Sequence, residues 1–214
     1  ITPKLQAAGW ENEPHSIAEQ RTFTDGRIIV RGNKAERRKG KRADYILRYT
    51  RDFSIAIVEA KADYKSPAAG LQQAKDYAEI LGLSFAYSTN GNGIVEFDFT
   101  SGVESNLSRF PAPEELWSRL QTNKGLNDEH KQKLLTPYNL QSGKIPRYYQ
   151  DIAINRAVQA IVQGKKRVLL TMATGTGKTT TAFQICWKLW SSRWNVAGKH
   201  RHPRILYLAD RSIL

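Results

Sequence analysis

Residues 167–179 read RVLLTMATGTGKT, an apolar run followed by a loop that holds two glycines and ends in lysine and threonine. A strand, such a loop and a following helix form a P-loop, whose backbone N–H groups and helix N-terminus surround phosphate oxygens. Gly175 and Gly177 allow this close approach because they carry no Cβ. We expect Lys178 to reach the β- and γ-phosphates of ATP and Thr179 to bind Mg²⁺. The expected nucleotide-binding residues of the loop are Thr174, Gly175, Thr176, Gly177, Lys178 and Thr179.

The residues around this loop predict a parallel α/β unit. Helices are expected at 148–163 and 178–190, and strands at 167–171 and 204–209. A strand, a helix and a second strand with a glycine-rich first turn open a doubly wound parallel sheet. Gln150, at the start of the upstream helix, is expected to contact an adenine, because its amide offers both a donor and an acceptor. The alternative for Gln150 is an ordinary surface glutamine.

Two apolar runs upstream, residues 43–49 and 54–60, predict a β-hairpin. With a two-residue turn between them, Asp44 faces Glu59 directly, and their Cβ atoms are expected about 4.5–5.5 Å apart. Lys61 shares the face of Glu59 because side chains alternate along a strand. Two carboxylates this close repel unless a cation lies between them, and Mg²⁺ suits such a pair. We therefore expect a Mg²⁺ site in which Lys61 orients a water or stabilises charge on a phosphate under attack.

The carboxylate pair also has a plainer interpretation, a surface hairpin whose charges pair with one another. Two features favour the metal site. The strands are otherwise apolar, so a structural charge there would be costly. A basic run also arrives just before Asp44, where the backbone of a bound DNA would need neutralising.

The flanking segments predict the rest of a first domain. A helix begins at Ser66-Pro67 and ends at Gly82, and it places Gln73 and Tyr77 on one face, where they can touch the site or the DNA. A short helix is expected at Ser16–Phe23, with Glu19 as a possible additional metal-site carboxylate. The remaining expected elements are a strand at 28–31, a loop at 31–42, strands at 84–88 and 94–99, and one helix at 114–121 within a connector.

The charge balance points to an anionic partner. The 214 residues include 33 Lys+Arg and 20 Asp+Glu, a net charge of +13, with many of the basic residues gathered between Arg27 and Arg51. Nucleic acid fits this excess, and a solvated basic loop is the alternative for the run itself. One cysteine excludes a disulfide framework and a cysteine-based zinc cluster, and the four histidines lack the spacing of a metal site. No apolar stretch approaches the ~18–20 residues that span a bilayer, so we expect a cytoplasmic protein without membrane contact.

Asp44, the run Glu59-Ala60-Lys61, and Gln73 with Tyr77, followed by a P-loop, resemble the R (restriction and motor) subunit of type I restriction endonucleases. The first residues are similar to the PD-(D/E)xK nuclease core, with Ala43 in place of its proline. Gln73 and Tyr77 are similar to the QxxxY element that follows this core in the family. Residues 147–150 resemble the adenine-recognition motif of the family, and residues 208–211 resemble its motif Ia.

The resemblance implies a fold and an activity. The fold would be a PD-(D/E)xK nuclease-like mixed sheet flanked by helices at 1–100, a connector at 101–146, and the beginning of a RecA-like parallel α/β domain at 147–214. The activity would be Mg²⁺-dependent cleavage of double-stranded DNA, coupled to ATP-driven translocation in a complex with methyltransferase and specificity subunits. The catalytic residues would be Asp44, Glu59, Lys61, Gln73 and Tyr77.

Two other functions remain open from the residues alone. One is a DNA helicase or translocase whose amino-terminal domain binds nucleic acid without cutting it. The other is a P-loop phosphotransferase for a small substrate, which the basic run and the connector disfavour because such an enzyme has no use for either.

Overall fold

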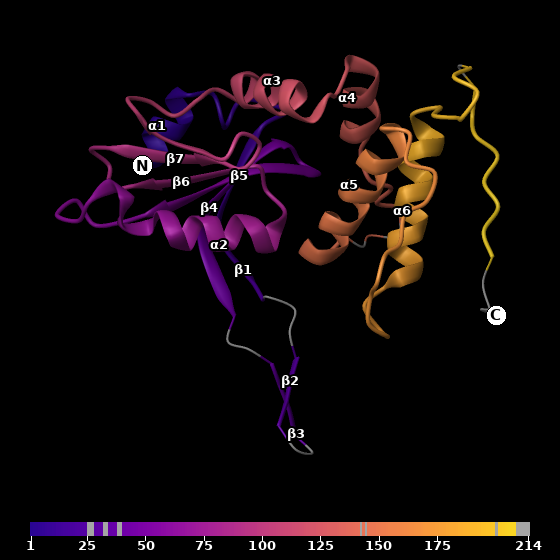
Figure 1. The fold of residues 1–214 in the computed structure, drawn as a ribbon, viewed down its shortest axis with the longest axis horizontal. Helices are drawn as coiled ribbons and strands as arrows, with labels where there is room; N and C mark the ends of the chain where they lie inside the picture. Colours follow the sequence, from indigo (N-terminus) through magenta and orange to yellow (C-terminus); the bar gives the residue numbers. More distant parts are fainter. Residues whose placement is uncertain are drawn as a thin grey trace. The chain divides into compact units, whose positions relative to one another are not determined.

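The computed structural model describes residues 1–24, 28–31, 34–37, 40–141, 143, 145–199 and 201–208. The chain divides into two units, Ile1–Leu126 (unit 1) and Asn127–Leu214 (unit 2) (Figure 1). The expected connector at 101–146 is thus shared between the two units. Among the described residues, none of the helices is long and apolar enough to cross a membrane.

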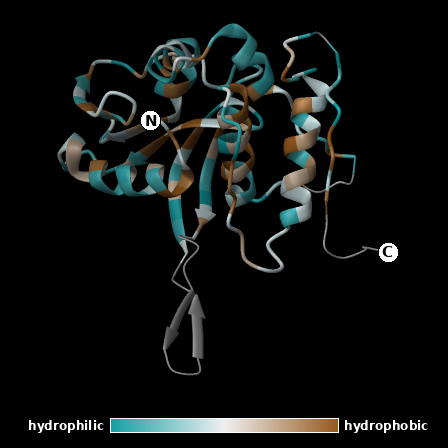
Figure 2. Cartoon of the chain, turned by 45° about the vertical axis from the view of Figure 1, so that its right-hand side comes forward, coloured by the Kyte–Doolittle hydropathy of each residue, from teal (hydrophilic) through white to brown (hydrophobic). Residues whose placement is uncertain are grey.

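Unit 1 is built on a mixed six-stranded sheet with the strand order β1-β4-β5-β6-β7-β8. The β5–β6 pair is parallel, and the other neighbouring pairs are antiparallel. Figure 2 shows hydrophobic residues on the strands at the centre of the unit and mostly hydrophilic residues on the helices around them. The strands are β1 Ser16–Phe23, β4 Lys41–Thr50, β5 Phe53–Ala60, β6 Phe85–Thr89, β7 Ile94–Asp98 and β8 Val103–Leu107, and the separate pair β2 Ile28–Arg31 and β3 Lys34–Arg37 forms a two-stranded ribbon.

Helices cover both faces of this sheet. Helix α2 (Leu71–Leu81) lies on one face, and α1 (Thr2–Ala7) and α3 (Pro113–Lys124) lie on the other (Figure 1). The Ser66 hydroxyl accepts a hydrogen bond from the Ala68 N–H at the 3-10 turn η1 (Pro67–Gly70), which leads into α2. Gly82 ends α2 with a φ of 67°, in the left-handed region that glycine adopts without strain. The helix predicted from Ser66 to Gly82 is confirmed.

The β4–β5 hairpin has the expected register at its functional end. Thr50 pairs with Phe53 at the turn, and Tyr45 pairs with Val58 further along, as the two-residue turn at 51–52 predicts. Between these points the pairing shifts, so that Arg48 rather than residue 49 lies opposite Ser54. The shift is reversed before Leu47, which pairs with Ala56, and the register that places residue 44 opposite residue 59 is restored.

Three sequence predictions for unit 1 are wrong in detail. Ser16–Phe23 is a strand and not a helix, because its backbone pairs with β4 from Ser16 opposite Arg48 to Phe23 opposite Lys41. The expected loop at 31–42 contains β3 and the start of β4. The expected connector supplies β8, the edge strand, as well as the predicted helix, which is α3.

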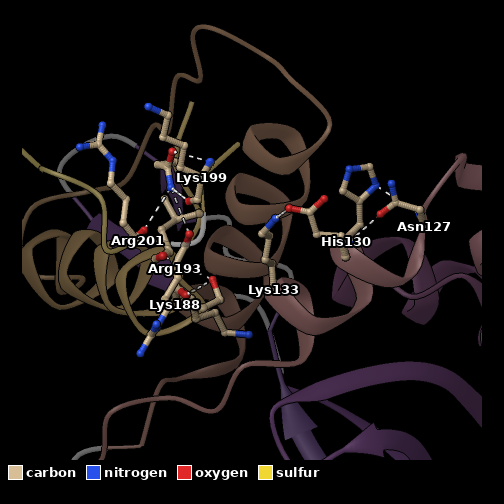
Figure 3. A network of polar contacts seen from close by, with 11 residues as sticks. Asn127, His130, Lys133, Lys188, Arg193, Lys199 and Arg201 are labelled. Carbon is tan, nitrogen blue, oxygen red and sulfur yellow. Dashed lines mark hydrogen bonds and ion pairs between the residues drawn. The ribbon is translucent and has the colours of Figure 1, made fainter. Parts of the chain in front are cut away.

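Unit 2 contains three helices among its described residues, α4 (Asp128–Leu135), α5 (Tyr148–Val162) and α6 (Lys178–Ser191). Asn127 caps α4, because its side-chain oxygen accepts from the His130 N–H while the His130 ring accepts from the Asn127 N–H (Figure 3). The buried Lys188 of α6 donates to the Leu134 carbonyl and to the Asn155 side chain. These bonds tie the three helices together.

The strands expected at 167–171 and 204–209 are not hydrogen-bonded strands in the part of the chain that the structure describes. A strand requires a paired neighbour to satisfy its backbone, and no pairing involves the described residues of these runs. Apolar side chains of both runs are exposed to solvent: Leu169 is 90% exposed and Leu206 is 83% exposed. Residues 209–211 of the expected motif Ia lie outside the described residues.

Candidate active site and nucleotide loop

The end of β5 brings two carboxylates together. Glu59 is 1% exposed and lies between β4 and β6, opposite Ser88 in the parallel β5–β6 register. Asp44 accepts a hydrogen bond of 2.8 Å from the Ala60 N–H through Oδ2, which holds its side chain beside Glu59. Burial, and then the charge of Asp44, raise the pKa of Glu59 to about 7, although Lys61 acts in the opposite direction. If both carboxylates of this pair are ionised, their negative charges therefore repel each other.

The Gln73 amide connects Lys61 and Tyr77 to this pair of carboxylates. The Lys61 ammonium lies 3.8 Å from Glu59 Oε2 and donates to Gln73 Oε1 over 2.9 Å. Gln73 Nε2 in turn donates to Glu59 Oε2 over 2.7 Å and to the Tyr77 hydroxyl over 3.3 Å. Helix α2 supplies both Gln73 and Tyr77 from one face, as their spacing of four predicts. The structure thus gathers Asp44, Glu59, Lys61, Gln73 and Tyr77 into one cluster.

The donor set fits a divalent cation such as Mg²⁺. Glu59 Oε1 is buried and has no hydrogen-bond partner among the described residues, so one carboxylate oxygen remains to be satisfied. Among the described residues, Asp44 Oδ1 has only a long contact of 3.5 Å, with Gln20 Nε2. Within the described ranges no group of three or more His, Cys, Asp or Glu side chains could hold a metal. Mg²⁺ does not need one, because it is usually bound by one or two carboxylates and keeps several waters.

Gln20, and not Glu19, is the β1 residue beside this pair. Glu19 pairs with Tyr45, the neighbour of Asp44, so it faces the opposite side of the sheet, where it accepts from the Thr2 hydroxyl. Gln20 has a φ of 53°, uncommon for a residue other than glycine, and its amide oxygen accepts from the Arg42 guanidinium. Because the sequence predicted a helix at Ser16–Phe23, it did not indicate this position. A strand that pairs with β4 places residue 20 opposite Asp44.

The phosphate loop precedes α6 in unit 2. Gly175 and Gly177 have φ values of 76° and 82°, the left-handed conformation that suits glycine. Lys178, the first residue of α6, is exposed and donates to the Met172 carbonyl, so its ammonium folds back over the loop. Thr179 is exposed beside it. The loop therefore has the conformation that the glycines predict, with its lysine and threonine open to solvent.

Gln150 contacts this loop directly. Its side chain is buried, and Nε2 donates to the Thr176 carbonyl over 2.9 Å while Oε1 accepts from the Arg147 N–H over 2.8 Å. A Cβ at Gly177 would lie 2.3 Å from the Gln150 Nε2 atom. The start of α5 is thus fixed against the loop by an amide, and Gln150 is not an ordinary surface residue.

Comparisons with known proteins identify the family. Over the whole chain it is 41% identical to the type I restriction enzyme EcoAI endonuclease subunit of Escherichia coli. It is also 62% identical, with a TM-score of 0.85 over 95% of its length, to a structure described as the fragment of a putative HsdR subunit of a type I restriction enzyme from Vibrio vulnificus YJ016. The chain belongs to the HsdR family of type I restriction enzyme endonuclease subunits.

Further similarities cover parts of the chain. The EcoKI endonuclease subunit of Escherichia coli strain K12 is 34% identical over 62% of it. The family model described as "Type III restriction enzyme, res subunit" matches residues 143–214. Measured against the relatives, the chain spans 26% of the EcoAI subunit, 11% of the EcoKI subunit and 39% of the Vibrio vulnificus chain. The HsdR resemblance is confirmed, and so is the expected mixed sheet flanked by helices, which has six strands and is followed by a helicase-like start.

This HsdR chain carries part of its basic run next to the carboxylates. Lys41 and Arg42 lie on β4, three and two residues before Asp44 respectively, and the Lys41 ammonium lies 5.4 Å from the centre of the Tyr77 ring. The side chains between Arg27 and Lys39 lie outside the described residues. The described part of the run therefore places two positive charges at the edge of the cluster.

Proposed function

We propose that unit 1 of this HsdR chain is a Mg²⁺-dependent nuclease that cleaves double-stranded DNA. The observation that carries the proposal is the pairing of Asp44 with Glu59, whose Oε1 is buried without a partner among the described residues, next to the Lys61 ammonium. Such a pair suits a cation, and an ammonium beside it suits a phosphate. The endonuclease names of the relatives support the same activity.

Each side chain of the cluster has a distinct task in this proposal. Asp44 and Glu59 hold Mg²⁺, which when bound lowers the pKa of a water and neutralises charge on the phosphate. Lys61 stabilises the negative charge that develops on the phosphate oxygens. Gln73 holds the Lys61 ammonium and one oxygen of Glu59, which leaves the other oxygen free for the cation. Tyr77 fixes the Gln73 amide, and Lys41 and Arg42 bind the DNA backbone.

Unit 2 supplies the ATP site in this proposal. Residues 174–177 surround the phosphates with backbone N–H groups, Lys178 exchanges the Met172 carbonyl for the β- and γ-phosphates, and Thr179 binds Mg²⁺. Gln150 would sense the nucleotide, because its amide touches the loop and can also pair with an adenine edge. ATP hydrolysis would drive translocation of DNA in a complex with methyltransferase and specificity subunits, a role that the relatives' type I restriction enzyme names support.

The test is cleavage by the assembled enzyme that contains the full-length subunit. Wild type is compared with Glu59→Gln and Lys61→Ala, with and without Mg²⁺, on DNA that carries the recognition site. We expect both substitutions to lower the rate of cleavage at least about 100-fold, with DNA binding retained. Equal cutting by all three proteins would overturn the nuclease proposal and favour a translocase whose first domain only binds DNA.

A further inference from the structure

The turn that leads into α2 passes unusually close to the cluster. Gly70 is the last residue of η1 and is buried. A Cβ at this position would lie 2.5 Å from Lys61 Cε, 2.8 Å from Ser88 Oγ and 3.3 Å from Glu59 Cβ. Its φ of −102° is available to any residue, so space and not backbone conformation requires glycine here.

Strand β6 holds the backbone on both sides of this contact. The Ser88 hydroxyl accepts from the Gly70 N–H over 3.0 Å in a buried bond, which fixes the distance between the turn and the sheet. The next carbonyl, that of Thr89, accepts from the Lys61 N–H over 2.8 Å. The Asn90 amide then donates to the carbonyls of Asp63 and Lys65 in the loop between β5 and η1. Hydrogen bonds thus hold the chain segment from Lys61 to the start of α2 against the end of β6.

We propose that Gly70 and Ser88 are positioning residues that aim the Lys61 ammonium. A lysine stem has four rotatable bonds, so the ammonium goes where the contacts of the stem direct it. The absence of a side chain at Gly70 leaves room for Cε of Lys61 beneath the turn. The hydrogen bond from the Gly70 N–H to Ser88 fixes the distance between the turn and β6. The inference rests on the proposed nuclease function, because it assigns these residues a part in that reaction.

The same geometry predicts what a methyl group at position 70 would do. The nearest atom, Lys61 Cε, belongs to the far end of a flexible side chain and can move aside cheaply, whereas the buried Ser88 Oγ at 2.8 Å must also shift and costs some stability. Moving Lys61 Cε takes the ammonium away from its 2.9 Å bond to Gln73 Oε1. Gln73 is three residues further on, so a shift of the turn also disturbs its amide. The rate constant of cleavage should therefore fall even in protein that folds.

The experiment is single-turnover cleavage by the assembled enzyme with full-length subunit, at saturating ATP and over a range of Mg²⁺ concentrations. We expect Gly70→Ala to lower the rate constant at saturating Mg²⁺ by about 10-fold or more, because a displacement near 1 Å is enough for such a loss. The amplitude of the reaction, the half-saturating Mg²⁺ concentration and ATP-driven translocation should stay at wild-type values. Ala69→Ser, at the exposed neighbour in the same turn, is the matched control and should cleave like wild type.

A second variant and a reference separate the outcomes. Ser88→Ala adds no atoms, and it should lower the same rate constant by a smaller factor, which tests the proposal even if Gly70→Ala fails to fold. Wild-type rate constants for Ser88→Ala and for any folded Gly70→Ala, beside an inactive Lys61→Ala, would overturn the positioning role and leave the nuclease proposal intact. A reduced amplitude with an unchanged rate constant would also overturn it, because that pattern reports lost folded protein. Wild-type cleavage by Lys61→Ala would overturn both proposals.

Discussion

The end of β5 and the phosphate loop both follow an apolar run, but they are held in place in different ways. Around Glu59, residues from β4, β6 and α2 interlock, and the preceding Ile57 and Val58 are completely buried. Around Lys178, the glycines and the first turn of α6 set the conformation, and Leu169 just before the loop is exposed. The carboxylate cluster thus depends on distant contacts, whereas the loop depends mainly on its own backbone.

This difference determines what substitutions should do in the assembled enzyme. Glu59→Gln should abolish cleavage and leave ATP-driven translocation at the wild-type rate. Lys178→Ala should lower translocation about 100-fold or more, because it removes the charge that meets the developing negative charge on the phosphates, and cleavage that depends on translocation should fall with it. Both variants should retain DNA binding. A translocation assay with a cleavage assay in parallel checks the pattern, and translocation by Lys178→Ala at the wild-type rate would contradict the proposed role of the loop.

A smaller effect should distinguish neighbouring residues on α2. Gln73→Ala removes hydrogen bonds to two charged groups, and we expect an effect on cleavage the size of one such bond, about 1.5–3 kcal/mol or about 10–100-fold. Gln72→Ala, one residue earlier, removes only a bond between exposed side chains, Gln72 and Asp76, and should cleave like wild type. Single-turnover rates of the two variants provide the measurement. Similar rates for both would mean that the contacts of Gln73 do not serve the reaction.

The smallest expected effect belongs to Tyr77→Phe. Its hydroxyl supports the Gln73 amide from 3.3 Å and does not touch either carboxylate of the pair in a hydrogen bond. Loss of a neutral hydrogen bond costs about 1 kcal/mol, which corresponds to about a 5-fold lower cleavage rate. A loss as large as that of Gln73→Ala would assign the hydroxyl a direct contact with DNA or with the attacking water.

The sequence predicted the loop and the cluster for different reasons. The loop is contiguous, so its adjacent residues predict its conformation without any distant partner. The cluster required a register, and the hairpin could be aligned because alternation and a short turn constrain it. The alignment survived at residues 44 and 59 because the irregularity near Arg48 reverses before Leu47. Two compensating shifts of this kind cannot be seen in the residues themselves.

Other features were beyond prediction because they depend on distant partners. Ser16–Phe23 is too short for its periodicity to decide between helix and strand, and pairing with β4 decides it. The position of Gln20 beside Asp44 follows from that pairing. Gly70 looks like an ordinary residue in a turn, and only the positions of Lys61 and Ser88 show why a side chain does not fit. The strand expected at 167–171 lacks a partner among the described residues, so its apolar pattern was not sufficient.

Calorimetric titration of Mg²⁺ into the nucleotide-free chain would show whether one cation binds between Asp44 and Glu59. We predict one bound ion for wild type, none at that affinity for Asp44→Asn or Glu59→Gln, and an undiminished stoichiometry for Lys61→Ala. Glu79→Gln, which removes an exposed carboxylate on α2, should bind like wild type. Unchanged binding by Asp44→Asn and Glu59→Gln would mean that these two carboxylates do not hold the cation.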